Sequence, residues 1–182
     1  MPAIETDRLR LRMLGGDDLD DLARMFADPD VTKYVGDGKP ASRDEALRAL
    51  HSIISGWQDR GYGRWAAVDR TTGAFIGFGG LRSLLGTPEV VYHLTKQHWG
   101  KGLATELARA ALRFGFEDRG FDRVVAIAKP ANVASIHVME KLGMQFEKHA
   151  SYYDIDVVQY GITRAEFRWN GSSYNVLPDS ST

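Results

Sequence analysis

Apolar and polar positions alternate along this chain with two different periods, and the periods predict which segments are strands and which are helices. Residues 8–13 alternate strictly, with arginine at every second position, which is typical of a strand with one apolar face. From Leu19 the apolar residues recur at helical spacing, and the pair Asp28-Pro29 is expected to end that helix. The chain therefore opens with a strand followed by a helix.

A second helix and a hairpin follow. Ser42 and Glu45 have the spacing of a capping box, and an apolar stripe runs behind them as far as Trp57. Residues 65–68 and 75–81 are apolar runs separated by a polar turn that contains glycine, so an antiparallel hairpin is expected there.

The second half of the chain alternates strands with helices. Residues 90–94 form an apolar run, and residues 103–114 carry an apolar stripe at helical spacing that ends near Gly120. Residues 124–128 are an unbroken apolar run, typical of a strand that is covered on both faces. A strand, a helix and a strand in this order predict a right-handed parallel crossover.

The chain is expected to close with a helix and two strands, at residues 132–142, 145–153 and 157–163. Residues 169–182 show no periodicity, and we expect an irregular C-terminal tail there. These elements predict one domain over residues 1–168 with an α/β fold. Its mixed sheet has about seven strands, with an antiparallel N-terminal half, a central parallel βαβ crossover and helices on both faces.

The segment between residues 90–94 and the next helix has the pattern of an anion-binding site. Gly100 and Gly102 lack a Cβ atom, so the backbone can take a positive φ and approach a phosphate closely. The helix that follows begins with unpaired N–H groups and a dipole that favours negative charge. Residues 97–105 are therefore expected to bind a phosphate-containing ligand, unless the glycines serve only a tight turn.

Two familiar phosphate loops fit this segment poorly. A Walker loop carries Ser or Thr directly after its lysine, but Lys101 is followed by Gly102. A dinucleotide fingerprint has a third glycine where this chain has Thr105, although Asp122 lies at the spacing of its ribose-binding acid. A nucleotide-dependent oxidoreductase is therefore a rival on spacing, but it needs a repeated parallel βαβ array that this chain does not predict.

A third pattern, Q-x-x-G-x-G/A, matches Gln97, Gly100 and Gly102 in full. It is the coenzyme A loop of the GCN5-related N-acetyltransferase (GNAT) superfamily, and the chain resembles the RimJ/RimL-like branch of that family. The resemblance extends to segments at residues 5–12, 89–94, 132–144 and 160–167. It implies the acetyltransferase fold and an acyltransferase that moves an acetyl group from acetyl-CoA to a primary amine, by direct transfer in a ternary complex.

The resemblance also implies which residues contact acetyl-CoA. These are Leu94, Thr95, Gln97, Trp99, Gly100, Lys101, Gly102, Leu103, Ala104, Thr105, Asn132 and Ser135. Lys96 is a further candidate for phosphate contact, as a point charge. The alternative function is a non-catalytic acyl-CoA-binding module on the same fold. The acceptor is left open among a protein N-terminus, an amino acid, a polyamine and an antibiotic amine.

Acetyl transfer needs a neutral amine, and the resemblance places a base or water-orienting glutamate at Glu89. A lysine-like amine costs about 4–5 kcal/mol to deprotonate at pH 7 and an α-amine only about 1 kcal/mol, so a base matters most for the former. His93 lies on the same strand face if the strand is regular, and it is the second candidate base. A β-bulge, expected from the resemblance, would change which way His93 faces.

The leaving thiol and the acetyl carbonyl need hydrogen-bond donors. Many family members have a tyrosine in the last helix as proton donor, but this chain has Met139 there. The resemblance assigns Ser135 to the coenzyme sulfur and Asn132 to the pantetheine arm, whereas without it Asn132 is simply a helix N-cap. It also suggests the backbone N–H of Leu94 or Thr95 as the donor to the carbonyl oxygen.

Composition narrows the remaining possibilities. At 182 residues, with 43% apolar and 26% charged residues, the chain suits one globular domain. Its formal net charge of −1 favours neither nucleic acid nor an anionic membrane as a partner, and a homodimer is compatible with the sequence. Without cysteine the chain forms no disulfide and no acetyl-cysteine intermediate, and its histidines show no metal-ligand spacing, so no metal is expected. A cytoplasmic location is expected.

Overall fold

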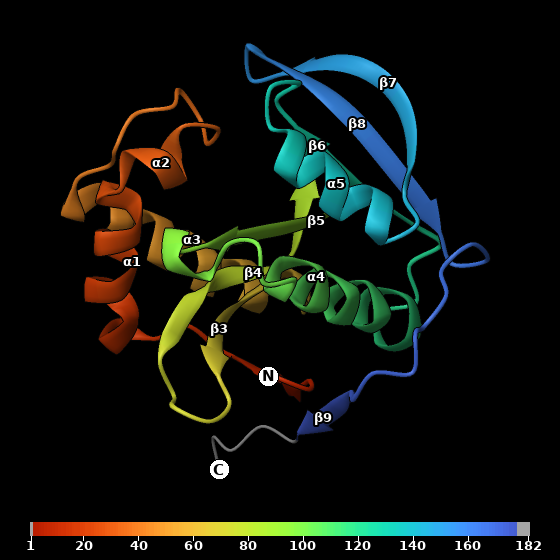
Figure 1. Cartoon of the computed structure of the whole chain (residues 1–182), viewed down its shortest axis with the longest axis horizontal. Coiled ribbons are helices and arrows are strands. Elements are labelled where there is room, and N and C mark those ends of the chain that lie inside the picture. Colours follow the sequence, from red (N-terminus) through yellow and green to blue (C-terminus); the bar gives the residue numbers. More distant parts are fainter. Residues whose placement is uncertain (1, 178–182) are drawn as a thin grey trace.

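The computed structural model describes residues 2–177, which form one nine-stranded sheet with helices on both faces (Figure 1). The strands are β1 (Ala3–Glu5), β2 (Leu9–Arg12), β3 (Arg64–Asp69), β4 (Phe75–Leu84), β5 (Thr87–Leu94), β6 (Arg123–Ala128), β7 (Gln145–Tyr152), β8 (Ile155–Thr163) and β9 (Asn175–Leu177). Their order across the sheet is β7-β8-β6-β5-β4-β3-β2-β1-β9. The β5–β6 pair is parallel and the other neighbours are antiparallel, which confirms the predicted mixed sheet with a central crossover.

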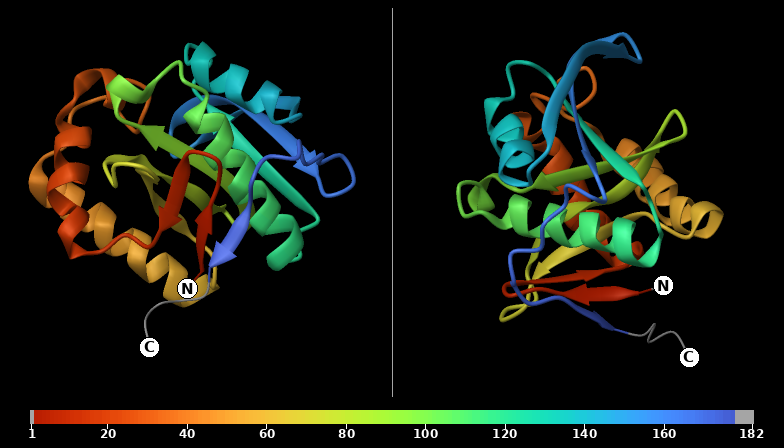
Figure 2. Two further views of the ribbon diagram at one scale, coloured as in Figure 1. Left: turned by 60° about the horizontal axis from the view of Figure 1, so that its bottom comes forward. Right: turned by 90° about the vertical axis from the view of Figure 1, so that its right-hand side faces the viewer.

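The helices pack in two layers, one on each side of the sheet. They are α1 (Leu19–Ala27), α2 (Pro29–Thr32), α3 (Arg43–Arg60), α4 (Leu103–Arg113) and α5 (Val133–Lys141). Figure 2 shows α3, in orange, and α4, in green, on opposite sides of the sheet. The α1 and α2 helices lie with α3, and α5 lies with α4. A π-helical turn, Phe114–Asp118, continues α4, so the helical segment ends close to the predicted Gly120.

Local sequence explains where α3 begins and ends. Ser42 and Glu45 form the predicted capping box, in which Glu45 N–H donates to the Ser42 hydroxyl at 3.3 Å and Ser42 N–H donates to the Glu45 carboxylate at 2.7 Å. Gly61 ends the helix with φ of 68°, in the left-handed region that glycine tolerates.

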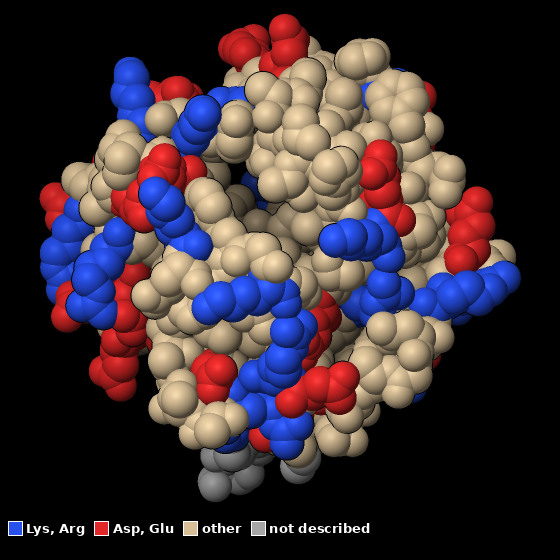
Figure 3. Space-filling view, viewed as in Figure 1, with Lys and Arg blue, Asp and Glu red and all other residues tan. Residues whose placement is uncertain are grey.

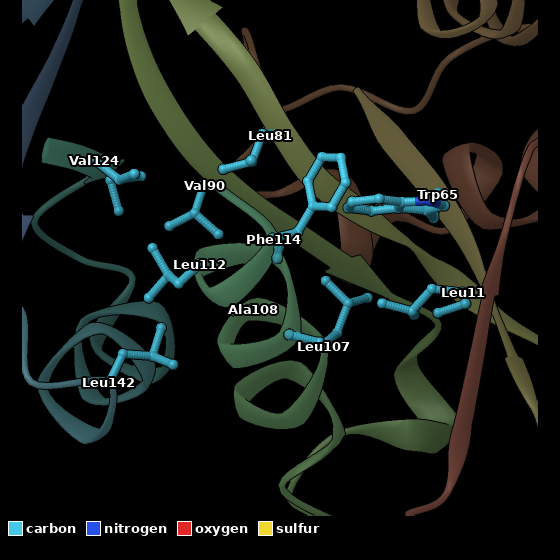
Figure 4. Packing of buried hydrophobic residues seen from close by; sticks show 14 of the residues in the cluster. Leu11, Trp65, Leu81, Val90, Leu107, Ala108, Leu112, Phe114, Val124 and Leu142 are labelled. Carbon is cyan, nitrogen blue, oxygen red and sulfur yellow. The ribbon is translucent and has the colours of Figure 1, made fainter. Parts of the chain in front are cut away.

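Two apolar clusters hold the layers together. On one face, Leu107 and Leu112 of α4 pack towards Trp65 and Val90 of the sheet (Figure 4). On the other face, a second cluster joins α1 and α3 to the sheet; among its members are Leu22, Leu50, Ile53, Ala66 and Phe78. Because both faces of the central strands are covered, these strands read as continuous apolar runs in the sequence.

The two halves of the sheet separate at the centre. The parallel strands β5 and β6 are paired at one position, where Glu89 lies opposite Val125. On its other side β5 stays paired with β4 from Thr87 to Leu94 without a shift in register. The second half of β5 therefore has one edge facing the gap towards β6. The expected bulge in this strand was wrong, since the regular pairing keeps Glu89 and His93 on one face of the sheet.

Two short strands were missed by the sequence patterns, so the sheet has nine strands where about seven were predicted. β1 pairs with β2 and with β9, and Ile4 lies opposite both Leu11 and Val176. β9 lies within the segment 169–182 that was expected to be irregular, whereas residues 178–182 of that segment lie outside the described residues. A three-residue strand is too short to show a period, and β9 in addition pairs with β1, at the other end of the chain.

Candidate active site

The gap between β5 and β6 opens into a cavity of about 740 Å³. Its walls come from α2, β5, the loop before α4, β6, α5 and the β7–β8 hairpin. Figure 3 shows the molecule hollowed at this place, between the α2 side and the α5 side. Because α2 lies in one helix layer and α5 in the other, the cavity connects the two faces of the sheet.

The glycine loop forms one end of this cavity. Gly100 and Gly102 have φ of 72° and 77°, a region that side chains other than glycine rarely adopt. No atom lies within 4 Å of the position that a Cβ of Gly100 would take. Gly102 is the N-cap of α4 and has no side chain to bond the first N–H groups of the helix. Three features of the loop therefore suit a phosphate-bearing ligand: the backbone conformation of its glycines, the open space beside Gly100 and the unpaired N–H groups at the start of α4.

An arginine from the N-terminal hairpin holds this loop in place. Arg8 donates from Nη1 to the carbonyl oxygen of Lys101 at 2.8 Å and from Nε to the carboxylate of Glu106 at 2.7 Å. The hydroxyl of Thr6 donates to the same carboxylate at 2.6 Å. Alternation along residues 8–13 identified this arginine only as part of a polar strand face. In the structure it fixes the start of α4 from outside the cavity.

The structure brings most of the implied coenzyme residues together. Those that line the cavity are Leu94, Trp99, Gly100, Gly102, Leu103, Ala104, Thr105, Asn132 and Ser135, and Glu89 lines it as well. Thr95, Gln97 and Lys101 belong to the same loop but do not line the cavity. Lys96 forms an ion pair at 2.5 Å with Asp30 of α2, which lines the cavity, so this ion pair links the glycine loop to α2.

The two suggested backbone donors differ in what they bond. Thr95 N–H donates to the carbonyl oxygen of Ile76 at 2.9 Å and is thus occupied. In an antiparallel pair successive N–H groups point alternately to the partner strand and away from it. Leu94 N–H therefore points away from β4 and into the gap between β5 and β6. Of the two groups, Leu94 N–H is the one that can bond an oxygen in the cavity.

A tyrosine that sequence reasoning missed lies against Ser135. The Tyr92 hydroxyl donates to the carbonyl oxygen of Ser135 at 3.0 Å and lies 3.0 Å from the Ser135 hydroxyl oxygen. Asn132 caps α5 by accepting from Ser135 N–H at 3.2 Å, which fixes the serine in the first turn. Tyr92 and Ser135 both line the cavity. The signal for Tyr92 in the sequence was its even spacing from Leu94 along β5.

Glu89 lies where β5 and β6 meet, at the base of the gap. Its side chain is 1% exposed and is paired bidentately with Arg82, at 2.6 and 3.1 Å. Burial raises the pKa of Glu89, while the hydrogen bond from Arg82 and the charge of Arg64 act against that rise. A carboxylate with a raised pKa is a better proton acceptor than an exposed one, and each of its oxygens, although bonded to Arg82, keeps a lone pair that can accept a further hydrogen.

His93 lies on the same face of β5 and lines the cavity. Its ring stacks on Phe78 with 4.9 Å between ring centres. Burial lowers the pKa of His93 to about 3, and the positive charges of Arg82 and Arg64 act in the same direction. The imidazole is therefore neutral at physiological pH and only weakly basic, which argues against His93 as the group that takes the amine proton.

Positive charge exceeds negative charge near the face of β5 that carries Glu89 and His93. Burial lowers the pKa of Arg64 to about 10, and its neighbours Arg82 and Arg60 act in the same direction. A guanidinium with this pKa still carries its charge at pH 7. Arg64 and Arg82 together thus place two positive charges against the one negative charge of Glu89. The same two arginines lower the pKa of His93, so their field extends to the cavity wall.

Aromatic side chains line the end of the cavity opposite the glycine loop. Tyr34, Tyr152 and Tyr153 contribute to this wall. Tyr153 and Asp154 form the two-residue turn of the β7–β8 hairpin with φ of 54° and 61°, and Tyr153 is 69% exposed. Two other large aromatics belong to the core: Trp65 packs on Trp57, and Phe78 packs on Phe26.

Within residues 2–177 no three His, Asp or Glu side chains gather closely enough to hold a metal ion. Across the same described part of the chain, no helix has both the length and the apolar composition needed to span a membrane.

Comparison with known proteins places this cavity in context. A family model described as an acetyltransferase (GNAT) domain matches residues 8–145. The chain is 34% identical to the uncharacterised protein YkkB of Bacillus subtilis over 85% of its own length and 92% of that protein. It is 30% identical to the FsC-acetyl coenzyme A-N(2)-transacetylase of Aspergillus fumigatus, covering 91% of this chain and 78% of that enzyme.

Among solved structures, the fold is similar to that of an acetyltransferase from Agrobacterium tumefaciens. The TM-score is 0.80 at 27% identity, and the match covers 89% of this chain and 94% of that one.

Proposed function

The chain belongs to the GNAT family and is an acetyltransferase acting on an amine, and from this premise we propose how its own residues bind acetyl-CoA and transfer the acetyl group. The coenzyme's phosphates bind at residues 97–105, and its thioester end enters the gap between β5 and β6. The amine acceptor approaches from the opposite face, between α2 and the β7–β8 hairpin. Transfer is direct, within a ternary complex.

One observation carries this proposal: a single cavity contains the glycine loop, the gap edge of β5 and Ser135. A ligand bound through its phosphates at the start of α4 can therefore extend to the centre of the sheet without leaving the cavity. Acetyl-CoA supplies the acetyl group as a thioester. The Leu94 N–H donates to the carbonyl oxygen, where negative charge develops, and a donor of this kind is worth about 2.7–4 kcal/mol.

The face of the sheet that carries Glu89 and His93, from which the amine acceptor approaches, favours a neutral amine. Arg64 and Arg82 give it an excess of positive charge, which lowers the pKa of an ammonium group held nearby. Glu89 is the one carboxylate at the base of the gap, and it accepts the amine proton, directly or through a water. The two arginines and Glu89 thus act together: the positive charges make the ammonium proton easier to remove, and the carboxylate accepts it.

The loop assignment is tested by calorimetry with acetyl-CoA. Gly102→Val strains a left-handed residue beside the unpaired N–H groups of α4 and places a Cβ 3.6 Å from Nη2 of Arg8, so we expect it to weaken binding by at least about 10²-fold. Gly73→Val is the control for the backbone strain: Gly73 has φ of 72°, close to the 77° of Gly102, but lies in the β3–β4 turn away from the cavity. Equal affinities for the two folded variants would remove the loop from the binding site.

Catalysis is tested separately, with a panel of amines and a thiol-release assay. Amino acids, polyamines, N-terminal peptides and aminoglycosides cover the open acceptor classes. Acetyl-CoA binding together with release of CoA in the presence of one class supports the enzyme. Tight binding without thiol release across the panel favours the non-catalytic acyl-CoA-binding module.

A further inference from the structure

Tyr92 and Ser135 form a pair of hydroxyl groups inside the cavity, and neither the family match nor the related proteins assign a role to the tyrosine. Tyr92 comes from β5 and Ser135 from the first turn of α5, so the pair joins the strand on one side of the gap to the helix that follows β6. Their oxygen atoms are 3.0 Å apart.

A hydrogen count shows what this pair can do. The phenol has one hydrogen, and its two neighbours are the carbonyl oxygen and the hydroxyl of Ser135. A carbonyl oxygen only accepts, so the phenol hydrogen satisfies it, and the phenol oxygen can then accept from the serine hydroxyl. While the cavity holds no ligand, the serine hydrogen has the phenol oxygen as its partner. When a stronger acceptor arrives, the serine hydrogen turns to it, and the phenol, whose oxygen is 3.0 Å from both Ser135 oxygens, donates its hydrogen to the serine hydroxyl oxygen and holds it in place.

The position along β5 indicates which acceptor that is. Leu94 N–H faces the gap two residues beyond Tyr92, and residues at this spacing have side chains on the same face of a strand. An acetyl oxygen bonded to Leu94 N–H places the adjoining sulfur on the cavity wall next to the two hydroxyls. This step rests on the proposed function.

We propose that Tyr92 is a positioning residue that holds the Ser135 hydroxyl so that it donates a hydrogen bond to the coenzyme sulfur. When the C–S bond breaks, its electron pair goes to sulfur, and the serine hydrogen bond stabilises the thiolate that forms. Neither hydroxyl gives up its proton in this step. The proton released by the amine leaves on the other face of the sheet.

Burial makes the tyrosine suited to this role. It raises the pKa of Tyr92 to about 12, so the phenol keeps its hydrogen over the whole physiological range. The orientation of the serine is therefore independent of pH where the enzyme acts. The arrangement also accounts for the absence of a tyrosine at Met139, because the sulfur already has a donor.

The proposal is tested on the bound thiol, without any acceptor. The pKa of CoA bound to the enzyme is measured from the ultraviolet absorbance of its thiolate, with the desulfo-CoA complex as the reference. We expect Ser135→Ala to raise that pKa by about one unit, the effect of one hydrogen bond to a charged atom. Tyr92→Phe should raise it in the same direction, and the double variant should raise it no further than Ser135→Ala alone.

Desulfo-CoA affinity, measured by calorimetry, should change by less than about two-fold in all three variants, because the hydrogen bond that they remove is one to sulfur. Tyr160→Phe is the matched control, since Tyr160 is a half-buried tyrosine of β8 that does not line the cavity. It should leave the thiol pKa as it is in the native protein.

Three results would overturn the assignment of Tyr92. A Tyr92→Phe variant with the native thiol pKa would mean that the phenol only packs. An additive double variant would mean that Tyr92 contacts the sulfur itself, and a Ser135→Ala variant without effect would remove the pair from the thiol. Failure of the native protein to bind CoA at all would instead overturn the proposed function. The two failures are therefore distinguishable.

Discussion

The charged residues at the base of the gap determine how the amine loses its proton. Glu89 is buried and bidentately paired with Arg82, and Arg64 adds a second positive charge nearby. A guanidinium next to a carboxylate lowers the proton affinity of that carboxylate, whereas burial raises it. For Glu89 burial is the larger effect, and the pKa is raised overall. The pair can therefore accept a proton near neutral pH more readily than an exposed glutamate.

Glu89→Gln should lower saturating turnover by about 10²-fold at neutral pH, because the amide keeps the shape but cannot take a proton. The deficit should shrink as the pH rises towards the pKa of the acceptor amine, which then arrives neutral. In the native enzyme, turnover should fall as the pH drops through the raised pKa of Glu89, since a protonated carboxyl is no base. The measurement is turnover against pH with a confirmed acceptor.

His93→Gln is the comparison for this variant, and we expect it to retain most activity. A pKa of about 3 leaves His93 neutral across the measured range, so its titration should add no step to the profile above about pH 5. Loss of activity in His93→Gln with near-native activity in Glu89→Gln would move the base to His93. If both variants are near native, the amine arrives neutral and an α-amine becomes the favoured acceptor.

At the scale of elements, local patterns predicted what local interactions determine. The capping box at Ser42, the hairpin β3–β4 and the crossover from β5 to β6 all depend on residues close in sequence. β1 and β9 were missed because each has three residues; β1 pairs with the neighbouring β2, whereas β9 pairs with β1 across almost the whole chain. Nothing local distinguishes such a segment from a loop.

In the candidate site too, the residues in contiguous motifs were predicted and their distant partners were not. The glycine loop, Asn132 and Ser135 were found because their motifs are contiguous, and of the residues implied there all but Thr95, Gln97 and Lys101 line the cavity. The partner of Ser135 lies 43 positions away, and the arginine that holds the loop reaches a carboxylate 98 positions away. Contacts at such separations follow from packing, and a single sequence does not encode them in any visible pattern.

The contact between the N-terminal hairpin and α4 leads to a prediction for coenzyme affinity. Arg8→Ala removes the side-chain bonds to the Lys101 carbonyl and to Glu106 and leaves only the backbone N–H bond to Glu106, so the loop should become mobile and acetyl-CoA should bind about 10-fold more weakly. Arg10→Ala removes the same charge two residues further on, in β2, where Arg10 is exposed. Calorimetry should show near-native affinity for Arg10→Ala. Equal weakening in both variants would mean that only net charge matters.

At the scale of the whole molecule, two parts of one sheet meet at a single position. The part from β9 to β5 and the part from β6 to β7 are joined through the pair Glu89–Val125. Beyond it they are held by the apolar faces of α4 and α5, where Leu107, Leu112 and Leu142 belong to one cluster (Figure 4). The gap that serves binding is therefore also a place where the sheet lacks hydrogen bonds. A ligand that fills it adds contacts to both parts.

Acetyl-CoA should accordingly raise the thermal stability of the whole chain. A ligand at about 100 times its dissociation constant stabilises the folded state by about 2.7 kcal/mol. For a chain of this length that corresponds to a rise in Tm of about 5–10 °C. Scanning calorimetry with acetyl-CoA, NADH and NADPH measures it. We expect a rise with acetyl-CoA alone. At the same concentration Gly102→Val, which binds about 10²-fold more weakly, should rise by no more than about 1–2 °C, while Gly73→Val should respond like the native protein. A rise with NADH or NADPH equal to that with acetyl-CoA would contradict a coenzyme A site, because those cofactors share the pyrophosphate but lack the pantetheine arm that enters the gap.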